Sequence, residues 1–436
     1  MSCFYTYFPP LVGYLCVITV WLCGCGGALI ERPTSGVCAR APLRQWADKA
    51  AYSLTFSAFH AVHLYDQDGD GKALALPEHG CAQGCQAVLS YPDPQRFSGG
   101  DPAFSRMSGR SFTYDNALAV LWRTEQGDLA GAEAILRTLV ALQRPNGAWG
   151  FSFSTGNDGF YNAGYVRTGA VAWVVYALAR WQTASLDKRF AEPLARGIRW
   201  ILAERNASGL YDAGYGRWRN DTQFDPDFVA QFAATEHQID VWYALMATVQ
   251  AAPQLAADLE LPQRAEALAA TMKRLLWMDQ QHRFAQGFQG ESQDSHSALD
   301  AAGTWAALWL WSQRNPELAA DILRTVTSQH AVSIGDWRGL RPYLTQEPLT
   351  WFVEGSLAEP LLLSRLGRAQ QAHESLQQFA DLACAGQVPL VYSPVWADDF
   401  PLSPAAAPTL WFALVASELL EGKSFLWTET ATSARP

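Results

Sequence analysis

The feature that most constrains the fold is a helical periodicity that covers most of the chain. From residue 43 onward, apolar residues recur with a period of 3.6, and strand-like alternation is almost absent. This pattern predicts twelve helices arranged in six pairs. They are expected at residues 43–63, 113–126, 130–143, 166–183, 188–204, 234–252, 261–276, 295–313, 316–329, 349–366, 368–382 and 406–420.

The predicted helices alternate in character. Odd members are amphipathic, as in Leu186–Arg205, whereas even members are apolar on nearly every side, as in Thr168–Trp181. An amphipathic helix has one solvated face, and a helix that is apolar all round is buried. Connections alternate in step, because short turns such as Glu125–Asp128 follow even helices and long loops such as Arg144–Tyr165 follow odd ones.

An inner ring of six apolar helices within an outer ring of six amphipathic helices satisfies both alternations. The sequence therefore predicts an all-α protein, an (α/α)6 toroid of six helical hairpins. All long loops then lie at the end where the inner helices begin, and short β-hairpins are expected within them. Long loops on a rigid scaffold commonly carry function, so a cleft is expected at this end.

The N-terminal residues are typical of an export signal, since no charged side chain precedes Glu31 and the apolar run Leu11–Leu22 is short for a membrane span. The stretch "LCGC", ending at Cys25, is similar to a bacterial lipoprotein signal with Cys25 as the lipidated residue. Because the n-region lacks Lys and Arg, a plain cleaved signal or an uncleaved anchor stays open. The chain is expected to be exported, as a periplasmic or outer-membrane lipoprotein, and to touch a membrane only through this segment.

These observations divide the chain into four parts. They are a signal at 1–25, a short linker at 26–42, the toroid at 43–424 and a flexible tail at 425–436.

Charge and cysteine content narrow the possible partners. A formal charge of -10, without a basic cluster, excludes nucleic acid as the main partner, because such binding depends on clustered Lys and Arg.

In an oxidising compartment, the four cysteines Cys38, Cys81, Cys85 and Cys384 allow three disulfide pairings. The nearest pair, Cys81 and Cys85, is the expected local disulfide.

An Asp-rich loop at 65–80 resembles the start of an EF-hand. Its candidate calcium ligands are Asp66, Asp68, Asp70, the Lys72 carbonyl and Glu78. An EF-hand needs a bidentate Glu at its twelfth position, but Pro77 stands there in this chain. The loop is thus expected to be either a structural calcium clip at the cleft rim or a solvated acidic turn. No organic cofactor is expected.

Carboxylates stand at the predicted starts of the inner helices, where ring packing alone would not require them. They are Asp115, Glu236, Asp240, Asp300 and Glu354. Glu236 and Asp240 are four residues apart and share one helical face. First-turn carboxylates also act as caps or favour the helix dipole, so each residue has a structural alternative. His237 is interpreted as a substrate-binding residue of the same helix start.

Aromatic residues are unusually frequent, with 18 Trp in the chain. Several lie in the long loops or at helix starts, where flat rings can stack on sugars. Together with His237 and Asp300, the predicted substrate-binding residues are Tyr114, Trp149, Tyr161, Tyr165, Arg167, Trp218, Trp351 and Trp396. Paired carboxylates in an aromatic cleft are suited to glycosidic bond cleavage, in which one carboxyl donates a proton and another activates water or attacks directly.

At this point the chain resembles the bacterial six-hairpin glycosidase-like proteins. The stretches that carry the resemblance are Tyr114–Gln143, Thr235–Ala247, Leu299–Leu310, Trp351–Gly367 and Pro404–Leu414. The resemblance implies an exported protein acting on a poly- or oligosaccharide, with acid/base hydrolysis in many members and lyases or epimerases among others. It implies Glu236 as general acid and Glu354 as base, with Asp115 and Asp240 positioning sugar or water. The chain departs from the family pattern at Glu359 and Pro360.

Two other functions are compatible with the pattern. A terpenoid cyclase uses a similar toroid, but it needs an acidic cluster, and Asp225–Asp227 is a poor candidate. A glycan-binding scaffold lipoprotein of an exopolysaccharide system would keep the aromatic cleft without needing paired carboxylates.

Overall fold

The computed structural model describes residues 43–52, 54, 56–58, 65–66, 84–91, 109–155, 160–220, 223–335, 337–344, 349–383, 388–389, 391–392 and 404–430. Cys25, Cys81, Asp68, Asp70, Lys72, Glu78 and Trp396 lie outside these residues, so their predicted roles are not addressed by it. Within this part of the chain, no helix combines the length and apolar character needed to cross a membrane.

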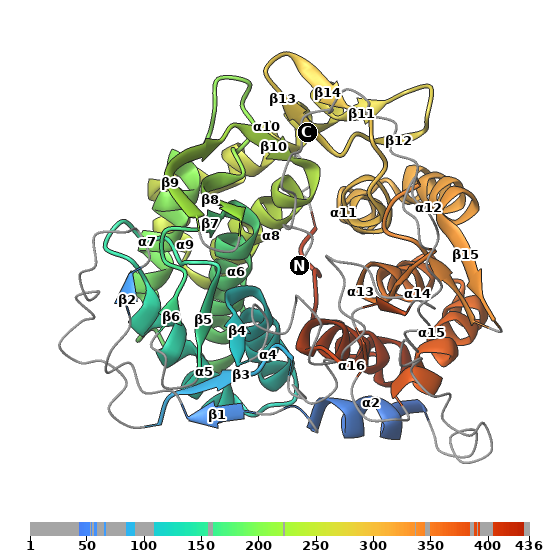
Figure 1. Ribbon diagram of the computed structural model, residues 1–436, viewed down its shortest axis with the longest axis horizontal. Helices are drawn as coiled ribbons and strands as arrows, with labels where there is room; N and C mark the ends of the chain where they lie inside the picture. The colour runs from blue at the N-terminus through green and yellow to red at the C-terminus, as the bar shows by residue number, and fades with distance from the viewer. Residues whose placement is uncertain are drawn as a thin grey trace, which may run out of the picture.

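Six inner helical units form a closed ring, as predicted (Figure 1). They are α4 (Thr113–Glu125), α6 (Thr168–Ser185), α8 (Thr235–Ala251), the π-helix η2 (Leu299–Thr304) continued by α11 (Trp305–Ser312), α13 (Val353–Ser356) continued by α14 (Ala358–Arg365), and α16 (Ala406–Glu421). Each contacts the next around the ring, and α16 returns to contact α4. The inner helices are buried on nearly every side, which explains why their sequences are apolar all round.

Six outer helices cover this ring. They are α2 (Leu43–Tyr52), α5 (Leu129–Leu142), α7 (Ala191–Ala203), α10 (Leu261–Leu275), α12 (Pro316–His330) and α15 (Ala369–Ala383). Five of them pack on the inner helix that precedes them in sequence, whereas α2 packs on α16 and so completes the sixth hairpin from the other end of the chain. The toroid is therefore closed by its first and last described helices.

Three details differ from the sequence prediction. The helix expected at 43–63 ends at Tyr52, because Phe56–Ala58 forms strand β1, which pairs with β3 (Gln86–Val88). A short helix, α9 (Pro253–Asp258), interrupts the turn between α8 and α10. The inner helix expected from 349 starts only at Val353, after strand β17 (Trp351–Phe352).

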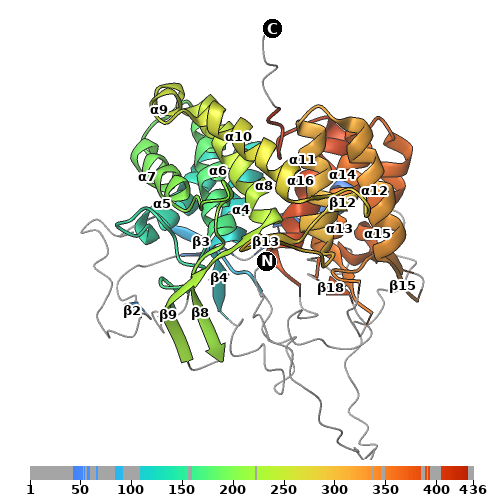
Figure 2. The ribbon, with the colours of Figure 1, turned by 90° about the horizontal axis from the view of Figure 1, so that it is seen from above.

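The long loops contain short strands and lie together at one end of the ring, as expected (Figure 2). Besides β1, β3 and β17, these strands are β2 (Tyr65–Asp66), β4 (Arg110–Phe112), β5 (Ser152–Ser154), β6 (Phe160–Tyr161), β7 (Val166–Arg167), β8 (Gly214–Asn220), β9 (Gln223–Ala230), β10 (Phe232–Ala234), β11 (Trp277–Met278), β12 (Arg283–Phe284), β13 (Gly287–Gln289), β14 (Ser292–Asp294), β15 (Ala331–Ile334), β16 (Trp337–Leu340) and β18 (Val391–Tyr392).

Strand pairing joins each long loop to its neighbour. Antiparallel pairs link β4 with β5, β7 with β8, β10 with β13 and β17 with β18. An isolated bridge between Ala298 and Tyr343 connects a fifth pair of neighbouring loops, and the Ala406 N–H donates to the Ser90 carbonyl between the last loop and the first. The loop end is consequently held by backbone hydrogen bonds that cross from hairpin to hairpin, and this fixes the positions of the inner-helix starts.

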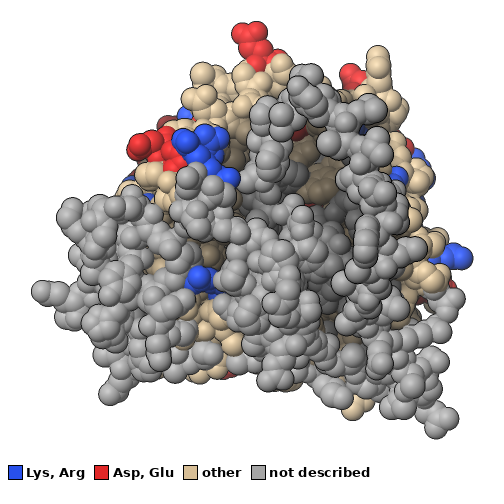
Figure 3. Space-filling view, in the orientation of Figure 1, with Lys and Arg blue, Asp and Glu red and all other residues tan. Residues whose placement is uncertain are grey.

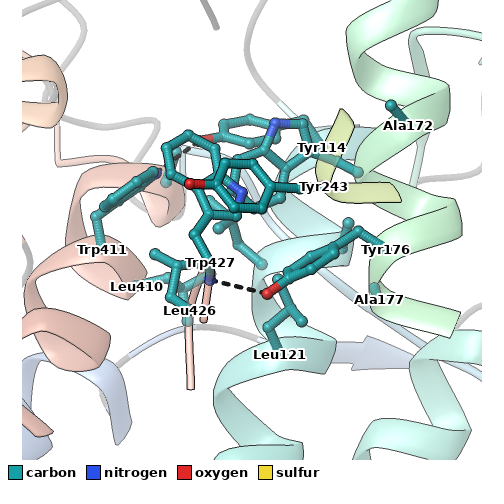
Figure 4. Packing of buried hydrophobic residues seen from close by; sticks show 14 of the residues in the cluster. Tyr114, Leu121, Ala172, Tyr176, Ala177, Tyr243, Leu410, Trp411, Leu426 and Trp427 are labelled. Carbon is teal, nitrogen blue, oxygen red and sulfur yellow. Dashed lines mark hydrogen bonds between the residues drawn. The ribbon is translucent and has the colours of Figure 1, made fainter. Parts of the chain in front are cut away.

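The C-terminal residues fill the axis of the toroid, so the expectation of a flexible tail is wrong for residues 425–430. Trp427 is 1 % exposed and stacks on Tyr243 with ring centroids 4.7 Å apart. Its backbone N–H donates to the Tyr176 hydroxyl at 2.8 Å (Figure 4). Trp427 adopts a φ of +51°, which a bulky residue rarely adopts, and the surrounding packing holds it there.

Two ion pairs hold this segment in place. Arg180 of α6 binds the buried Glu429 at 2.7 Å. Arg365 of α14 binds Glu418 of α16 at 2.8 Å and also donates to the Trp427 carbonyl at 2.9 Å. The described chain ends at residue 430, on the side of the ring opposite the loops (Figure 2). Within the described residues, this segment thus fills the axis of the ring at the end opposite the loops.

Candidate active site

The five predicted carboxylates converge at the loop end of the inner ring. Asp115, Glu236, Asp300 and Glu354 lie in the first turns of α4, α8, η2 and α13, and Asp240 lies one turn further along α8. All five are between 0 % and 8 % exposed. Since the loops pair side by side around the rim, these helix starts are brought to one end, and the positive ends of the helix dipoles favour negative charge there.

A pocket with about 350 Å³ of empty space lies among these helix starts. Its residues are Phe112, Tyr114, Phe151, Gly169, Ala170, Trp173, Glu236, Asp240 and Trp305. Glu236 and Asp240 supply its acidic groups, and the remaining wall is mainly aromatic. The pocket therefore combines carboxylates with flat ring faces, which is the combination that the sequence predicted.

The carboxylates act on one another electrostatically. Burial raises the pKa of Asp240 well above its usual range, and the neighbouring charges of Glu236 and Asp300 raise it further, against a hydrogen bond from Trp173. Burial also raises the pKa of Glu354, and Asp300 adds to this effect. The Asp115 pKa rises to about 7, again chiefly through burial, with Ser90 opposing the shift. Some of these groups consequently keep a proton near neutral pH.

His237 is buried beside the pocket and is held in its neutral form. Burial and the nearby Arg167 guanidinium lower its pKa to about 3. Gly169 of α6 allows α8 to approach closely here, because a Cβ at this position would lie 2.5 Å from His237 Cδ2 and 2.8 Å from Asp240 Oδ2. His237 can therefore offer a neutral imidazole, and the absence of a side chain at 169 is required by the pocket wall.

Glu354 is linked to the pocket through Tyr114. The Tyr114 hydroxyl donates to Glu354 Oε1 at 2.7 Å and accepts a hydrogen bond from Trp411 Nε1 at 2.7 Å. Tyr114 lines the pocket with its ring, while its hydroxyl is engaged on the protein side. Asp300 interacts electrostatically with both Asp240 and Glu354, and so lies between the α8 pair and Glu354 in this network.

Three of the aromatic residues that were predicted to bind substrate are instead buried in the protein interior. Trp149 is 0 % exposed and donates to the Leu139 carbonyl of α5. The Tyr161 hydroxyl donates to the Leu142 carbonyl and accepts from the Gly150 N–H. Trp351 packs between Trp337 and Phe379. None of the three lines the pocket, so the structure gives them a packing role.

The remaining predicted residues lie on the loops. Tyr165 is half-buried, packs its ring against Phe151 of the pocket and carries the Arg167 guanidinium 3.8 Å above its face. Arg167 donates to the carbonyls of Tyr215 and Gly216, and thus ties α6 to the β8 strand. Trp218 lies on β8 in register with Phe224. Tyr165 thus lies beside the pocket, and Arg167 links it to β8.

Figure 3 shows the loop-end face, on which basic and acidic side chains meet over the region of β8 and β9. On this hairpin, Arg217 and Arg219 both bind Asp225, at 3.2 Å and 2.8 Å. These exposed ion pairs contribute little to stability. Asp225, the first residue of the acidic stretch considered for a cyclase, is thus engaged by two arginines of its own hairpin.

Only one candidate calcium ligand falls within the described residues. Asp66 lies on β2, which runs parallel to β6 and pairs Asp66 with Tyr161. This pairing attaches the beginning of the Asp-rich loop to the rim of the toroid. Cys85 is disulfide-bonded, and its partner lies outside the described residues. No group of three or more His, Cys, Asp or Glu side chains within the described ranges could hold a metal ion.

Several pocket residues were not singled out from sequence. Trp173 and Trp305 form the base of the pocket, and Trp411 stacks on Trp305 with centroids 5.5 Å apart. All three stand in the second turn of an inner helix, a regularity that could have identified them. Phe112 and Phe151 reach the pocket through the pairing of β4 with β5, which the helical periodicity does not show. Gly169, in the first turn of α6, gave no sign in sequence of its close approach to α8.

Comparison with known proteins identifies solved structures of the same fold. No protein-family model matches the chain, and neither does any curated protein. Among solved structures, a glycosidase in complex with glucose has a TM-score of 0.55 and 15% identity over 86% of this chain and 97% of its own. A D-mannose isomerase has a TM-score of 0.53 and 13% identity, covering 77% of this chain and 91% of its own.

A sugar epimerase from a ruminal bacterium is similar as well, with a TM-score of 0.51 and 11% identity over 76% of this chain and 92% of its own. The chain shares the (α/α)6 toroid of these neighbours. At such low identity, the likeness shows the fold alone.

Proposed function

We propose that this protein is an exported glycoside hydrolase that cleaves a poly- or oligosaccharide. The observation that carries the proposal is a set of five buried carboxylates at four inner-helix starts, two of which, Glu236 and Asp240, line one aromatic pocket. Burying so many carboxylates is costly and serves no packing need, so a catalytic use accounts for their presence. Solved neighbours that include a glycosidase with bound glucose support a sugar as ligand.

In the proposed mechanism, Glu236 is the general acid. It lines the pocket beside Asp240, and two neighbouring buried carboxyls favour a state in which the pair retains a proton. Glu236 gives this proton to the glycosidic oxygen as the bond to the anomeric carbon breaks. Asp240 then carries negative charge beside the developing positive charge on the sugar ring.

Glu354 is the proposed base. It takes a proton from a water molecule whose oxygen forms the new bond to the anomeric carbon. Asp115 and Asp240 orient the sugar or the water. Trp173 and Trp305 supply apolar ring faces against which the sugar packs.

The experiment is a screen of polysaccharides and oligosaccharides for release of new reducing ends, with Glu236→Gln and Glu354→Gln as matched isosteric variants. Hydrolysis by the wild type that falls by about 10²-fold or more in each variant is expected, as for loss of an acid or base. Unchanged hydrolysis in Glu236→Gln would remove its assignment. Binding without release favours a glycan-binding scaffold, and conversion of a free sugar to its isomer without new reducing ends favours an epimerase or isomerase.

We also propose that the chain is a lipoprotein anchored through Cys25, and that the Asp-rich loop binds calcium as a structural brace. The first rests on the sequence motif that ends at Cys25, and the second on the Asp-rich motif and the link between Asp66 and the rim. Expression in a bacterium with a labelled fatty acid checks the first: label should enter the wild type and be lost in Cys25→Ser. Label retained in that variant would contradict the anchor.

A further inference from the structure

A buried hydrogen-bond relay leads from the pocket base to Glu354. Trp411 of α16 donates to the Tyr114 hydroxyl, and Tyr114 of α4 donates to Glu354 of α13, each at 2.7 Å (Figure 4 shows the first of these bonds). All three side chains are buried. The relay thus joins three inner helices that are far apart in the sequence.

The direction of the relay follows from the chemistry of the indole. Trp Nε1–H can only donate, so the Tyr114 oxygen must accept. The single hydroxyl proton of Tyr114 is then directed to Glu354 Oε1, which acts as an acceptor. An ionised carboxylate satisfies this arrangement and gains a charge-assisted hydrogen bond.

The rings of the relay are fixed by packing. Trp411 stacks on Trp305 with an interplanar angle of 18°, and Tyr114 packs edge-on against Trp173 with centroids 5.1 Å apart. Trp305 and Trp173 line the pocket. A ligand that packs on the pocket base therefore contacts the same aromatic layer that holds Glu354.

We propose that Tyr114 and Trp411 are positioning residues that hold Glu354 ionised and correctly oriented to act as the base. This inference rests on the proposed function in assigning Glu354 the role of base. It extends that proposal by giving Tyr114 a task beyond sugar contact and by bringing in Trp411.

The charges around Glu354 explain why such help is needed. Burial raises the pKa of Glu354, and the nearby Asp300 of η2 raises it further, whereas the Tyr114 hydrogen bond lowers it. Asp115 of α4 and Tyr91, which precedes that helix, are the other titratable groups that interact with its charge. Without Tyr114, the surroundings of Glu354 would favour its protonated form more strongly, and a protonated carboxyl cannot accept a proton from water.

The test is infrared titration of the purified protein, reading the C=O band of a protonated carboxyl that is absent in Glu354→Gln. In Tyr114→Phe, the midpoint of this band should move to higher pH. Trp411→Phe should move it in the same direction by less, because the hydroxyl remains but is less polarised. Tyr176→Phe is the matched control: it also removes a buried hydroxyl that is hydrogen-bonded to a glutamate, Glu429 at 3.1 Å, and it should leave the midpoint unchanged.

An unchanged midpoint in Tyr114→Phe, or an equal shift in Tyr176→Phe, overturns the inference. If Tyr114→Phe does not fold, Trp411→Phe decides, and an unchanged midpoint there also overturns it. Once a hydrolysed glycan is identified, the pH profile of kcat/KM can be compared with that of the wild type. Tyr114→Phe should lose about tenfold more kcat/KM at pH values below the ionisation of the base than at pH values above it, with little change in KM. The infrared midpoint does not depend on glycan cleavage, so failure of the proposed function and failure of the relay are distinguishable.

Discussion

Replacing Trp427 by Ala should strongly destabilise the protein. The side chain is 1 % exposed, stacks on Tyr243 and packs against Trp173, Trp305 and Trp411 at centroid distances of 5.3–5.5 Å. A buried aromatic ring removes roughly 150–250 Å² from water, which at about 25 cal/mol per Å² corresponds to about 4–6 kcal/mol as an upper value. Measured Trp-to-Ala losses in cores are about 3–5 kcal/mol. We expect a loss within the latter range.

The assay is equilibrium urea unfolding followed by far-ultraviolet circular dichroism, which reports the helical ring. Lys423→Ala is the control, because Lys423 is exposed at the start of the same segment and should change the free energy of unfolding by less than about 0.5 kcal/mol. If Trp427→Ala also stays within that margin, the C-terminal segment does not occupy the axis. Removal of residues 425–436 should reproduce the Trp427→Ala loss or exceed it, since it also removes the ion pair between Glu429 and Arg180.

Three further predictions concern the site and the rim. Gly169→Ala should cost about 1–3 kcal/mol of stability and reduce activity, because its Cβ would meet His237 and Asp240; a stable crystal structure with both side chains unmoved would contradict this. The Asp115 pKa of about 7 lies above its unfolded value, so the native state binds more protons between about pH 4 and 7 and loses stability as pH rises through that window. Asp115→Asn should therefore become more stable relative to the wild type as the pH rises from 4 to 8, by on the order of a few kcal/mol in urea unfolding. A difference between the two proteins that does not change with pH would refute the raised pKa. Calcium should raise the melting temperature of the wild type but not of Asp68→Ala, and no effect on the wild type would remove the proposed brace.

The helices were largely predictable because their signal is local. Each inner helix must be apolar all round and each outer helix on one face, so a periodicity in sequence reports directly on the ring. The π-helix at Leu299–Thr304 could not be predicted from periodicity. Its hydrogen bonds span one residue more than those of an α-helix, and this leaves the apolar pattern almost unchanged.

The candidate site was predictable only in part. The carboxylates stand at helix starts, and helix starts are visible in sequence, so their convergence follows from the ring. Sequence alone could not place the loop aromatics. A Trp or Tyr in a loop gives no sign of whether its polar atom faces a ligand or a backbone carbonyl, as Trp149 faces that of Leu139. The same holds for Tyr161 and Trp351. The position of Trp427 was likewise unpredictable, since its short apolar run is separated from the last helix by Glu421, Gly422, Lys423 and Ser424.

Closure of the ring by α2 and α16, with Trp427 inserted last, has a consequence for the order of folding. A chain that emerges from its N-terminus can form the hairpins α4–α5 to α14–α15 one after another, but α2 meets its main partner, α16, only at the end. The aromatic layer beneath the pocket remains open until residues near the C-terminus arrive. An incomplete chain thus exposes a large apolar interior. The protein should therefore form its binding site only after synthesis is complete, and, if it is exported unfolded, only after export is complete as well.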